Sequence, residues 1–325
     1  MMHNRLILSA AASLAMLAGA AALDARAQSY PSKPVTVMPA FPPGTPNDLI
    51  VRMMAERFQA ALKQPMVVDN RPGAGGNIAA EVVAHSVPDG HTLLATVDTV
   101  VTVNPLIYRK LNFKANGELV PIVYLANTSQ TLVCHPSVPV KSVAELVAHA
   151  KANPMSFASG GQGVPGHLAA ELFMSATGVT MNHIPYKGPG PAAQDVLAGV
   201  VPCGFLATAV VMPHVKSGKL HGLAVTSARR SPIAPTLPTM AEAGVTGYEA
   251  AFGEMLLAPK GTPAAVVARL NEVASAILQQ PEIRERMLQL DLDFVSNTPE
   301  EAAARVQRES DKWKRVVDRL GLKAD

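Results

Sequence analysis

The chain has 325 residues, of which 48% are hydrophobic and 16% are charged, and its formal net charge is +3. This length is sufficient for two α/β lobes with sizeable cores, and the composition excludes an intrinsically disordered chain. Aromatic residues make up only 4% of the chain, and no cluster of Lys and Arg is interleaved with them. A nucleic-acid-binding surface is therefore not expected.

The first 27 residues have the pattern of a cleaved export signal. Arg5 gives a positive start, Leu6 to Leu23 is uncharged and rich in Ala and Leu, and Ala25-Arg26-Ala27 fits an A-x-A cleavage site. The alternative, a membrane anchor, is disfavoured because the apolar run is marginal in length for a span. We expect cleavage after Ala27 and a periplasmic mature protein.

Residues 35–52 predict a rigid corner made of a strand, a loop and a helix. Val35 to Met38 is an apolar, β-branched run, and apolar residues from Leu49 to Phe58 recur at helical spacing. Asn47 is expected to cap this helix, with Asp48 in its positive first turn. Such a corner leaves backbone N–H groups free, and the helix dipole favours an anion there. The alternative is an ordinary strand–helix connection.

The strands at 35–38, 66–68 and 92–96 alternate with two helices, and this βαβαβ order predicts a mostly parallel, right-handed wound sheet. Further strands are expected at 66–68, 92–96, 121–125, 131–134, 155–159, 182–185, 200–206, 223–226 and 250–258. Further helices are expected at 78–85, 142–152, 168–176, 192–197, 211–217, 263–279, 282–290 and from 298 onward. Asp98 to Asn104 is expected to be a loop at the carboxyl end of a strand, where open α/β sheets bind ligands.

A second corner repeats the design of the first. The strand at 155–159 is followed by a Gly- and Pro-rich loop and by a helix that begins beside His167. Gly161, Gly163 and Gly166 match the spacing of a dinucleotide fingerprint, but no acidic residue ends the next strand, so no cofactor is expected. The signatures G-x-S-x-G, H-E-x-x-H and C-x-x-C do not occur in the sequence.

Two cysteines, Cys134 and Cys203, each lie in an apolar, strand-like run. An exported protein can oxidise its thiols, yet two mid-strand positions rarely meet the geometry of a bridge. We expect two buried free thiols, with a disulfide as the alternative.

Ordered motifs cover essentially the whole mature chain: Tyr30–Pro34, Phe41–Gly44, Asn70–Asn77, Pro88–Leu94, Asn104–Pro105, Phe157–Ser159, His167–Leu168, Pro185–Gly188, Leu223–Ser227 and Ala258–Pro263. Together they resemble the Bug (TctC-like) family of extracytoplasmic solute receptors of tripartite tricarboxylate transporters. The resemblance implies an α/β fold of the type II-like, two-lobed periplasmic-binding-protein kind, in which each lobe is a wound sheet flanked by helices. We expect lobe 1 to comprise residues 28–126 and 250–325, and lobe 2 to comprise residues 127–249.

The resemblance also implies the function and the site. Such receptors close on a small carboxylate, which they hold largely with backbone N–H groups and ordered water, and deliver it for uptake or sensing. It implies a monomer that works with membrane transporter subunits, without a metal, a cofactor or a catalytic residue. By position, the expected ligand-site residues are Phe41, Thr45, Asn47, Asp48, Asp98, Thr99, Gly161, Gln162, Val164, His167, Tyr186, Leu206 and Ala207.

Three stretches depart from the usual family pattern. Gly44-Thr45 stands where two glycines are usual, Val164-Pro165-Gly166 where serines are frequent, and Leu206-Ala207 where an Asp-Asn pair is common. The second-lobe wall is therefore expected to be apolar, and the ligand to combine one firmly held carboxylate with an apolar or aromatic remainder, unlike citrate.

Two enzyme hypotheses are alternatives to a receptor. The first is an exported enzyme that acts on a carboxylate substrate through His167 and either Asp48 or Asp98. The second is a dinucleotide-dependent oxidoreductase.

Overall fold

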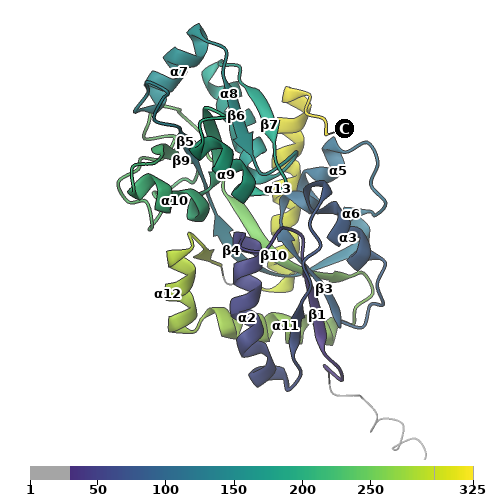
Figure 1. Cartoon of the computed structure of the whole chain (residues 1–325). Coiled ribbons are helices and arrows are strands. Elements are labelled where there is room, and N and C mark those ends of the chain that lie inside the picture. Colours follow the sequence, from purple (N-terminus) through teal and green to yellow (C-terminus); the bar gives the residue numbers. More distant parts are fainter. Residues whose placement is uncertain (1–29, 296, 325) are drawn as a thin grey trace, which may run out of the picture.

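The computed structural model describes residues 30–295 and 297–324, so the expected export signal lies outside the described residues. The strands form two separate sheets, one of six strands and one of five, each flanked by helices (Figure 1). We call the part built on the six-stranded sheet lobe 1 and the part built on the five-stranded sheet lobe 2. The expected two-lobed α/β fold is confirmed.

Lobe 1 is built on a sheet in which both ends of the chain take part. Its strand order is β11-β4-β10-β3-β1-β2. The strands are β1 (Val35–Pro39), β2 (Met66–Val68), β3 (Thr92–Val97), β4 (Leu119–Thr128), β10 (Phe252–Pro259) and β11 (Asp293–Phe294). β1 pairs in parallel with β2 and β3, whereas β10 is antiparallel to both β3 and β4.

The helices of lobe 1 are α2 (Pro46–Leu62), η1 (Ala74–Gly76), α3 (Asn77–Ala84), α4 (Thr99–Thr102), α5 (Asn104–Ile107), α6 (Ala115–Glu118), α11 (Ala264–Leu278), α12 (Pro281–Gln289) and α13 (Pro299–Leu320). The expectation of a loop from Asp98 to Asn104 is wrong, because α4 and α5 occupy this stretch. Its apolar side chains Val100, Val101 and Val103 are buried, and this packing compensates for the low helix propensity of β-branched residues.

Lobe 2 has the strand order β7-β6-β8-β5-β9. Its strands are β5 (Gln130–Cys134), β6 (Ser156–Ser159), β7 (Asn182–Pro185), β8 (Cys203–Ala207) and β9 (His221–Val225), and its helices are α7 (Val143–Ala152), α8 (Pro165–Thr177), α9 (Pro189–Leu197) and α10 (Thr208–Lys216). β5 runs antiparallel to β8 and β9, while β6 runs parallel to β7 and β8. Both sheets are therefore mixed. The βαβαβ segment does form the parallel strands β1, β2 and β3, but β4, β10 and β11 pair antiparallel, so the expectation of a mostly parallel sheet is wrong for the six-stranded sheet as a whole.

The last helix, α13, connects the two lobes. It begins at a capping box in which Thr298 accepts a hydrogen bond from the Glu301 N–H and the Glu301 carboxylate accepts one from the Thr298 N–H, as the sequence pattern predicts. Trp313 is buried and stacks on Phe252, with ring centroids 5.7 Å apart. The helix contacts β4 and α4 in lobe 1 and α8 in lobe 2, and in Figure 1 it is the yellow helix beside both sheets.

Cys134 and Cys203 form a disulfide, so the expectation of two free thiols is wrong. The two residues are direct partners in the antiparallel pairing of β5 and β8, with Cα atoms 4.0 Å apart. Residues that face each other on neighbouring antiparallel strands come closer than positions in unpaired strands. This pairing joins positions 69 residues apart, and the composition of either strand does not reveal it.

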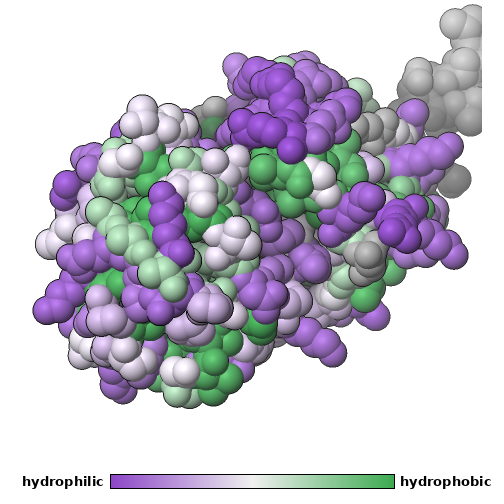
Figure 2. Space-filling model, turned by 90° about the horizontal axis from the view of Figure 1, so that it is seen from above, coloured by the Kyte–Doolittle hydropathy of each residue, from purple (hydrophilic) through white to green (hydrophobic). Residues whose placement is uncertain are grey.

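The surface of the described part is mixed in polarity. Figure 2 shows a face on which hydrophobic residues occur in separate patches between hydrophilic ones. Large exposed hydrophobic side chains are dispersed, among them Val67, Val87 and Val200. Within residues 30–295 and 297–324, no helix has both the length and the apolar character needed to cross a bilayer.

Candidate functional site

The first corner joins β1 to α2. Thr45, rather than Asn47, is the N-cap of α2, and its hydroxyl accepts a hydrogen bond from the Asp48 N–H at 3.5 Å. The expectation of an Asn47 cap is wrong because Pro46 occupies the first helical position, which suits proline, and the cap therefore falls on the residue before it. The Thr45 hydroxyl also donates to the Pro42 carbonyl at 2.8 Å, which closes the turn.

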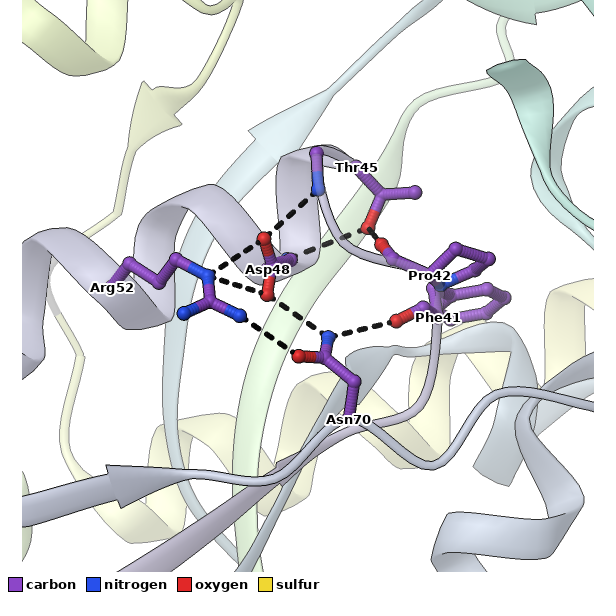
Figure 3. Close-up of polar contacts among 7 residues, drawn as sticks. Phe41, Pro42, Thr45, Asp48, Arg52 and Asn70 are labelled. Atoms are coloured by element: carbon purple, nitrogen blue, oxygen red, sulfur yellow. Dashed lines mark hydrogen bonds and ion pairs between the residues drawn. The ribbon is translucent and has the colours of Figure 1, made fainter.

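Asp48 ties this corner together (Figure 3). Its carboxylate accepts hydrogen bonds from the Gly44 N–H at 2.9 Å, from Arg52 Nε at 2.9 and 3.0 Å and from Asn70 Nδ2 at 2.9 Å. Asn70 Nδ2 also donates to the Phe41 carbonyl at 3.1 Å. Burial alone would raise the pKa of Asp48, but the hydrogen bonds from Arg52, Gly44 and Asn70 outweigh it and lower the pKa. The loop is therefore held by an ionised, fully bonded carboxylate.

Replacing this carboxylate is expected to loosen the corner. Asp48→Asn retains the shape but cannot accept from all three donors, and it leaves Arg52 without its ion pair, so we expect a loss of about 1–3 kcal/mol in the free energy of unfolding. Because the folded pKa is lowered, the stabilisation by Asp48 is present above the unfolded pKa and is lost as the pH falls through the folded value. Urea unfolding at neutral and acidic pH measures both effects.

The control is Asp69→Asn, which removes an exposed ion pair with Arg71 on the same face of lobe 1. Exposed pairs contribute little, so this variant is expected to remain within about 0.5 kcal/mol of the parent. Equal losses in the two variants would contradict a special role for Asp48.

The second corner joins β6 to α8. Val164 is the N-cap of α8 and Pro165 follows it, so this helix begins in the same way as α2, with a proline in its first turn. The Gly163 N–H donates to His167 Nδ1 at 3.1 Å, and Ser159 Oγ accepts from the Gly161 N–H at 3.2 Å. The positive φ angles of Gly161 and Gly163, +142° and +69°, allow the loop to turn sharply toward lobe 1.

The two corners meet at a cavity between the lobes. It is lined by Phe41, Thr45, Pro46, Asn47, Val97, Thr128, Gln130, Gly160, Val164, Pro165, Gly166, Pro189, Phe205, Leu206, Ala207 and Glu254. The first turns of α2 and α8 therefore line the same cavity. The lobes also touch beside it, where the Tyr108 hydroxyl donates to the Gln162 carbonyl at 3.3 Å.

Helix starts of this kind present free N–H groups. Proline has no N–H, so Asn47 and Gly166 carry the first donors of α2 and α8 after their prolines. Within the described part of the chain, neither N–H has a backbone hydrogen-bond partner. Two positive helix ends from different lobes thus point to the same region.

The structure brings most of the expected site residues to this region. Six of them line the cavity: Phe41, Thr45, Asn47, Val164, Leu206 and Ala207. Gly161, Gln162 and Tyr186 line a second cavity, which shares Phe41, Gly160 and Val164 with the first. Leu206 and Ala207 line the cavity together with Phe205, and Val97 joins them from lobe 1, so this part of the lining is apolar, as expected for the second lobe.

Four expected site residues, Asp48, Asp98, Thr99 and His167, line neither cavity. Asp98 lies behind the wall, where its Oδ2 accepts from the Gly253 N–H at 3.0 Å. Burial raises its pKa to about 7, Arg305 lowers it and Glu309 raises it. His167 is buried behind the loop, with Nε2 3.4 Å from the Glu171 carboxylate and its ring stacked on His183 at 4.2 Å. A base placed there does not face the cavity, which disfavours the enzyme hypothesis built on His167.

Sequence reasoning missed Glu254, Gln130 and Thr128 as lining residues. Gln130 and Thr128 lie where the chain passes from β4 to β5, so only the packing of the lobes brings them to the cavity. Glu254 did leave a signal, because it is the one charged residue in the apolar run from Ala250 to Pro259.

The glycines of the apparent dinucleotide fingerprint are explained by packing. A Cβ on Gly166 would lie 2.1 Å from the Phe205 carbonyl oxygen, and one on Gly163 would lie 3.0 Å from Asn104 Oδ1. Gly166 therefore allows the close approach of α8 to β8, and Gly163 allows the close contact between the two lobes.

The sequence matches the family TctC, described as Tripartite tricarboxylate transporter family receptor, over residues 50–322. The chain belongs to this family. It is 35% identical to the protein BugT of Bordetella pertussis over 300 residues, which cover 91% of this chain and 92% of BugT. The resemblance to Bug-type periplasmic receptors is thereby confirmed.

Solved structures of similar proteins support the same assignment. Rpa4515 of R. palustris, solved with adipate, superposes with a TM-score of 0.86 at 33% identity and covers 90% of this chain and 99% of its own. The periplasmic binding protein BugD gives a TM-score of 0.85 at 33% identity, with 91% and 100% covered. MatC of Rhodopseudomonas palustris, solved with bound malate, gives 0.83 at 29% identity, with 89% and 100% covered.

Proposed function

We propose that this receptor captures a small carboxylate in the cavity between its lobes and passes it to the membrane subunits of a tripartite tricarboxylate transporter or to a sensing system. The observation that carries the proposal is the meeting of two helix starts, one from each lobe, at a single cavity. Free N–H groups and two helix dipoles stabilise an anion without a basic side chain. Similar proteins whose structures contain adipate and malate support a carboxylate as the ligand class.

We further propose that residues 28–126 and 250–325 move as one body against residues 127–249, as a monomer that is exported to the periplasm. The chain passes from the first sheet to the second between Thr128 and Gln130, and it returns before Phe252. Hinge closure about these crossings would bury the ligand between the lobes. The apolar wall of Phe205, Leu206 and Ala207 favours an apolar remainder on the ligand over the second and third carboxylates of citrate.

A thermal-shift screen tests this function. Carboxylates with apolar remainders are expected to raise the melting temperature, because a ligand at 100 times its Kd adds about 2.7 kcal/mol to the stability of the folded state. Each acid is paired with its carboxamide, which has the same shape but no charge. Equal shifts from acid and carboxamide, or a larger shift from citrate than from every monocarboxylate, would overturn the proposal.

A further inference from the structure

A buried carboxyl group lies in the wall of a cavity that is proposed to bind an anion. Glu254 lines the cavity, and only 4% of its surface is exposed. It lies on β10 at an irregularity in the pairing with β4, where the register shifts between Glu254 and Met255. Irregularities of this kind re-aim side chains, so the sheet itself turns a carboxyl group toward the ligand region.

Asn47 is the one described residue that hydrogen-bonds the Glu254 carboxyl group, and its Nδ2 donates to Glu254 Oε2 at 2.9 Å. Within the described part of the chain, Glu254 has no ion pair, and the amide oxygen of the same asparagine, Asn47 Oδ1, is buried without a hydrogen-bond partner. Asn47 is 2% exposed and lines the same cavity. Buried acceptors without donors are costly, so a ligand that brings N–H groups would be favoured here.

A ligand that carries only a carboxylate would face Glu254 as a like charge, or would require Glu254 to stay protonated. An ammonium group instead provides three donors and the opposite charge. The start of α2, where the ligand carboxylate is proposed to lie, contains Asn47, whose side chain bonds Glu254. The proposed carboxylate position and Glu254 thus both adjoin Asn47, which suits the short separation of the two charges in an α-amino acid.

Resting on the proposed function, we propose that the ligand is an α-amino acid with an apolar side chain. Its carboxylate lies at the starts of α2 and α8, its ammonium group pairs with Glu254 beside Asn47, and its side chain packs on Val97, Leu206 and Ala207. The same apolar wall that disfavours citrate thus accommodates the remainder of this ligand.

The titration of Glu254 gives this proposal a second readout. Burial raises the pKa of Glu254 to about 7, the Asn47 hydrogen bond lowers it, and the charge of Asp98 raises it. The charged groups that act in turn on Asp98 are Arg305, Glu309 and Lys312 of α13. An ammonium partner favours the ionised carboxylate, so binding near pH 7 is expected to release protons and to weaken as the pH falls. A purely anionic ligand is expected to bind more weakly as the pH rises through 7.

The experiment uses matched pairs of ligands on the full mature protein. Leucine is compared with 4-methylpentanoate, and phenylalanine with 3-phenylpropanoate, by calorimetry in buffers of different ionisation enthalpy. At least one amino acid is expected to bind the parent protein at least about tenfold more tightly than its deaminated partner, with proton release. Glu254→Gln is expected to remove or reverse that preference, whereas Glu56→Gln on the exposed face of α2 makes the same charge change and is expected to retain it.

Each result decides the question. Deaminated acids that bind the parent as tightly as the amino acids would overturn this inference but leave the proposed function standing. An unchanged preference in Glu254→Gln would also overturn it. If no acid of either kind binds, the proposed function fails as well. Should Glu254→Gln not fold, the preference and the proton release of the parent protein decide by themselves.

Discussion

Gly166→Ala is expected to abolish ligand binding and to destabilise the protein, although alanine is the better helix former. A Cβ at this position would lie 2.1 Å from the Phe205 carbonyl oxygen and 3.3 Å from the Ser159 Cβ. Real Cβ atoms do not approach backbone so closely, so the first turn of α8 would have to move away from β8. Overpacking of this kind typically costs about 1–3 kcal/mol, and here it would displace the second corner from the cavity.

A matched control is available in the neighbouring helix. Gly190 lies in the first turn of α9 directly after Pro189, as Gly166 follows Pro165 in α8, and a Cβ there would meet nothing within 4 Å. Gly190→Ala is expected to stay within about 1 kcal/mol of the parent and to keep its ligand affinity, because the gain in helix propensity is offset by the contact of the new Cβ with Pro191, the next residue. Urea unfolding gives the stabilities, and titration with a ligand from the screen gives the affinities.

The difference in stability and affinity between the two glycine substitutions is the decisive result. Helix propensity predicts the same sign for both, whereas the contact with β8 exists only at Gly166. A Gly166→Ala protein that binds normally and unfolds at the parent's urea concentration would show that α8 has room to move, and the close approach to β8 would then not hold the site.

Removal of the disulfide is expected to have the second large effect. The bridge closes a loop between positions 69 residues apart. In the chain-entropy description, losing such a link costs about 2–4 kcal/mol and lowers the melting temperature by roughly 5–15 °C for a protein of this size. The double variant Cys134→Ala, Cys203→Ala avoids a new free thiol and tests this directly.

The accompanying measurements separate stability from function. A thiol titration of the unfolded parent protein without reductant is expected to find no free thiol among the two cysteines, and reductant is expected to lower the melting temperature of the parent but not of the double variant. Ligand affinity at a low temperature is expected to change little, because the bridge links the ends of β5 and β8 that are remote from Gln130 and Ala207 in the strand pairing. Equal stability with and without reductant would contradict the bridge.

Much of the fold followed from local patterns. Apolar β-branched runs placed most strands, and Ser142 and Thr298 placed the starts of α7 and α13. The two corners were recognisable because each depends on residues that are neighbours in the chain. The exact starts were less predictable: the cap of α2 is Thr45 and not Asn47, and α8 and α9 begin at Pro165 and Pro189, three residues before the expected starts.

The site was predictable in outline and not in detail. Phe41, Thr45, Val164 and Leu206 could be placed by position, and all four line the cavity. Asp98 and His167 could not be distinguished from lining residues. An ionisable side chain at a strand–helix connection is surrounded by the same sequence whether it faces the cavity or the core behind it. Glu254 was overlooked because the alternation of residues along a strand does not predict a register shift, and such a shift occurs between Glu254 and Met255.

By itself the sequence determined the two-lobed α/β class, the receptor family and the repeated corner. All three depend on short segments and on their order along the chain. Only the tertiary structure decided that Cys134 meets Cys203, that the sheets are mixed, and that Glu254 lines the same cavity as the starts of α2 and α8. The physical reason is that these features depend on the register between strands and on the approach of two lobes, which are set by packing among residues far apart in the chain.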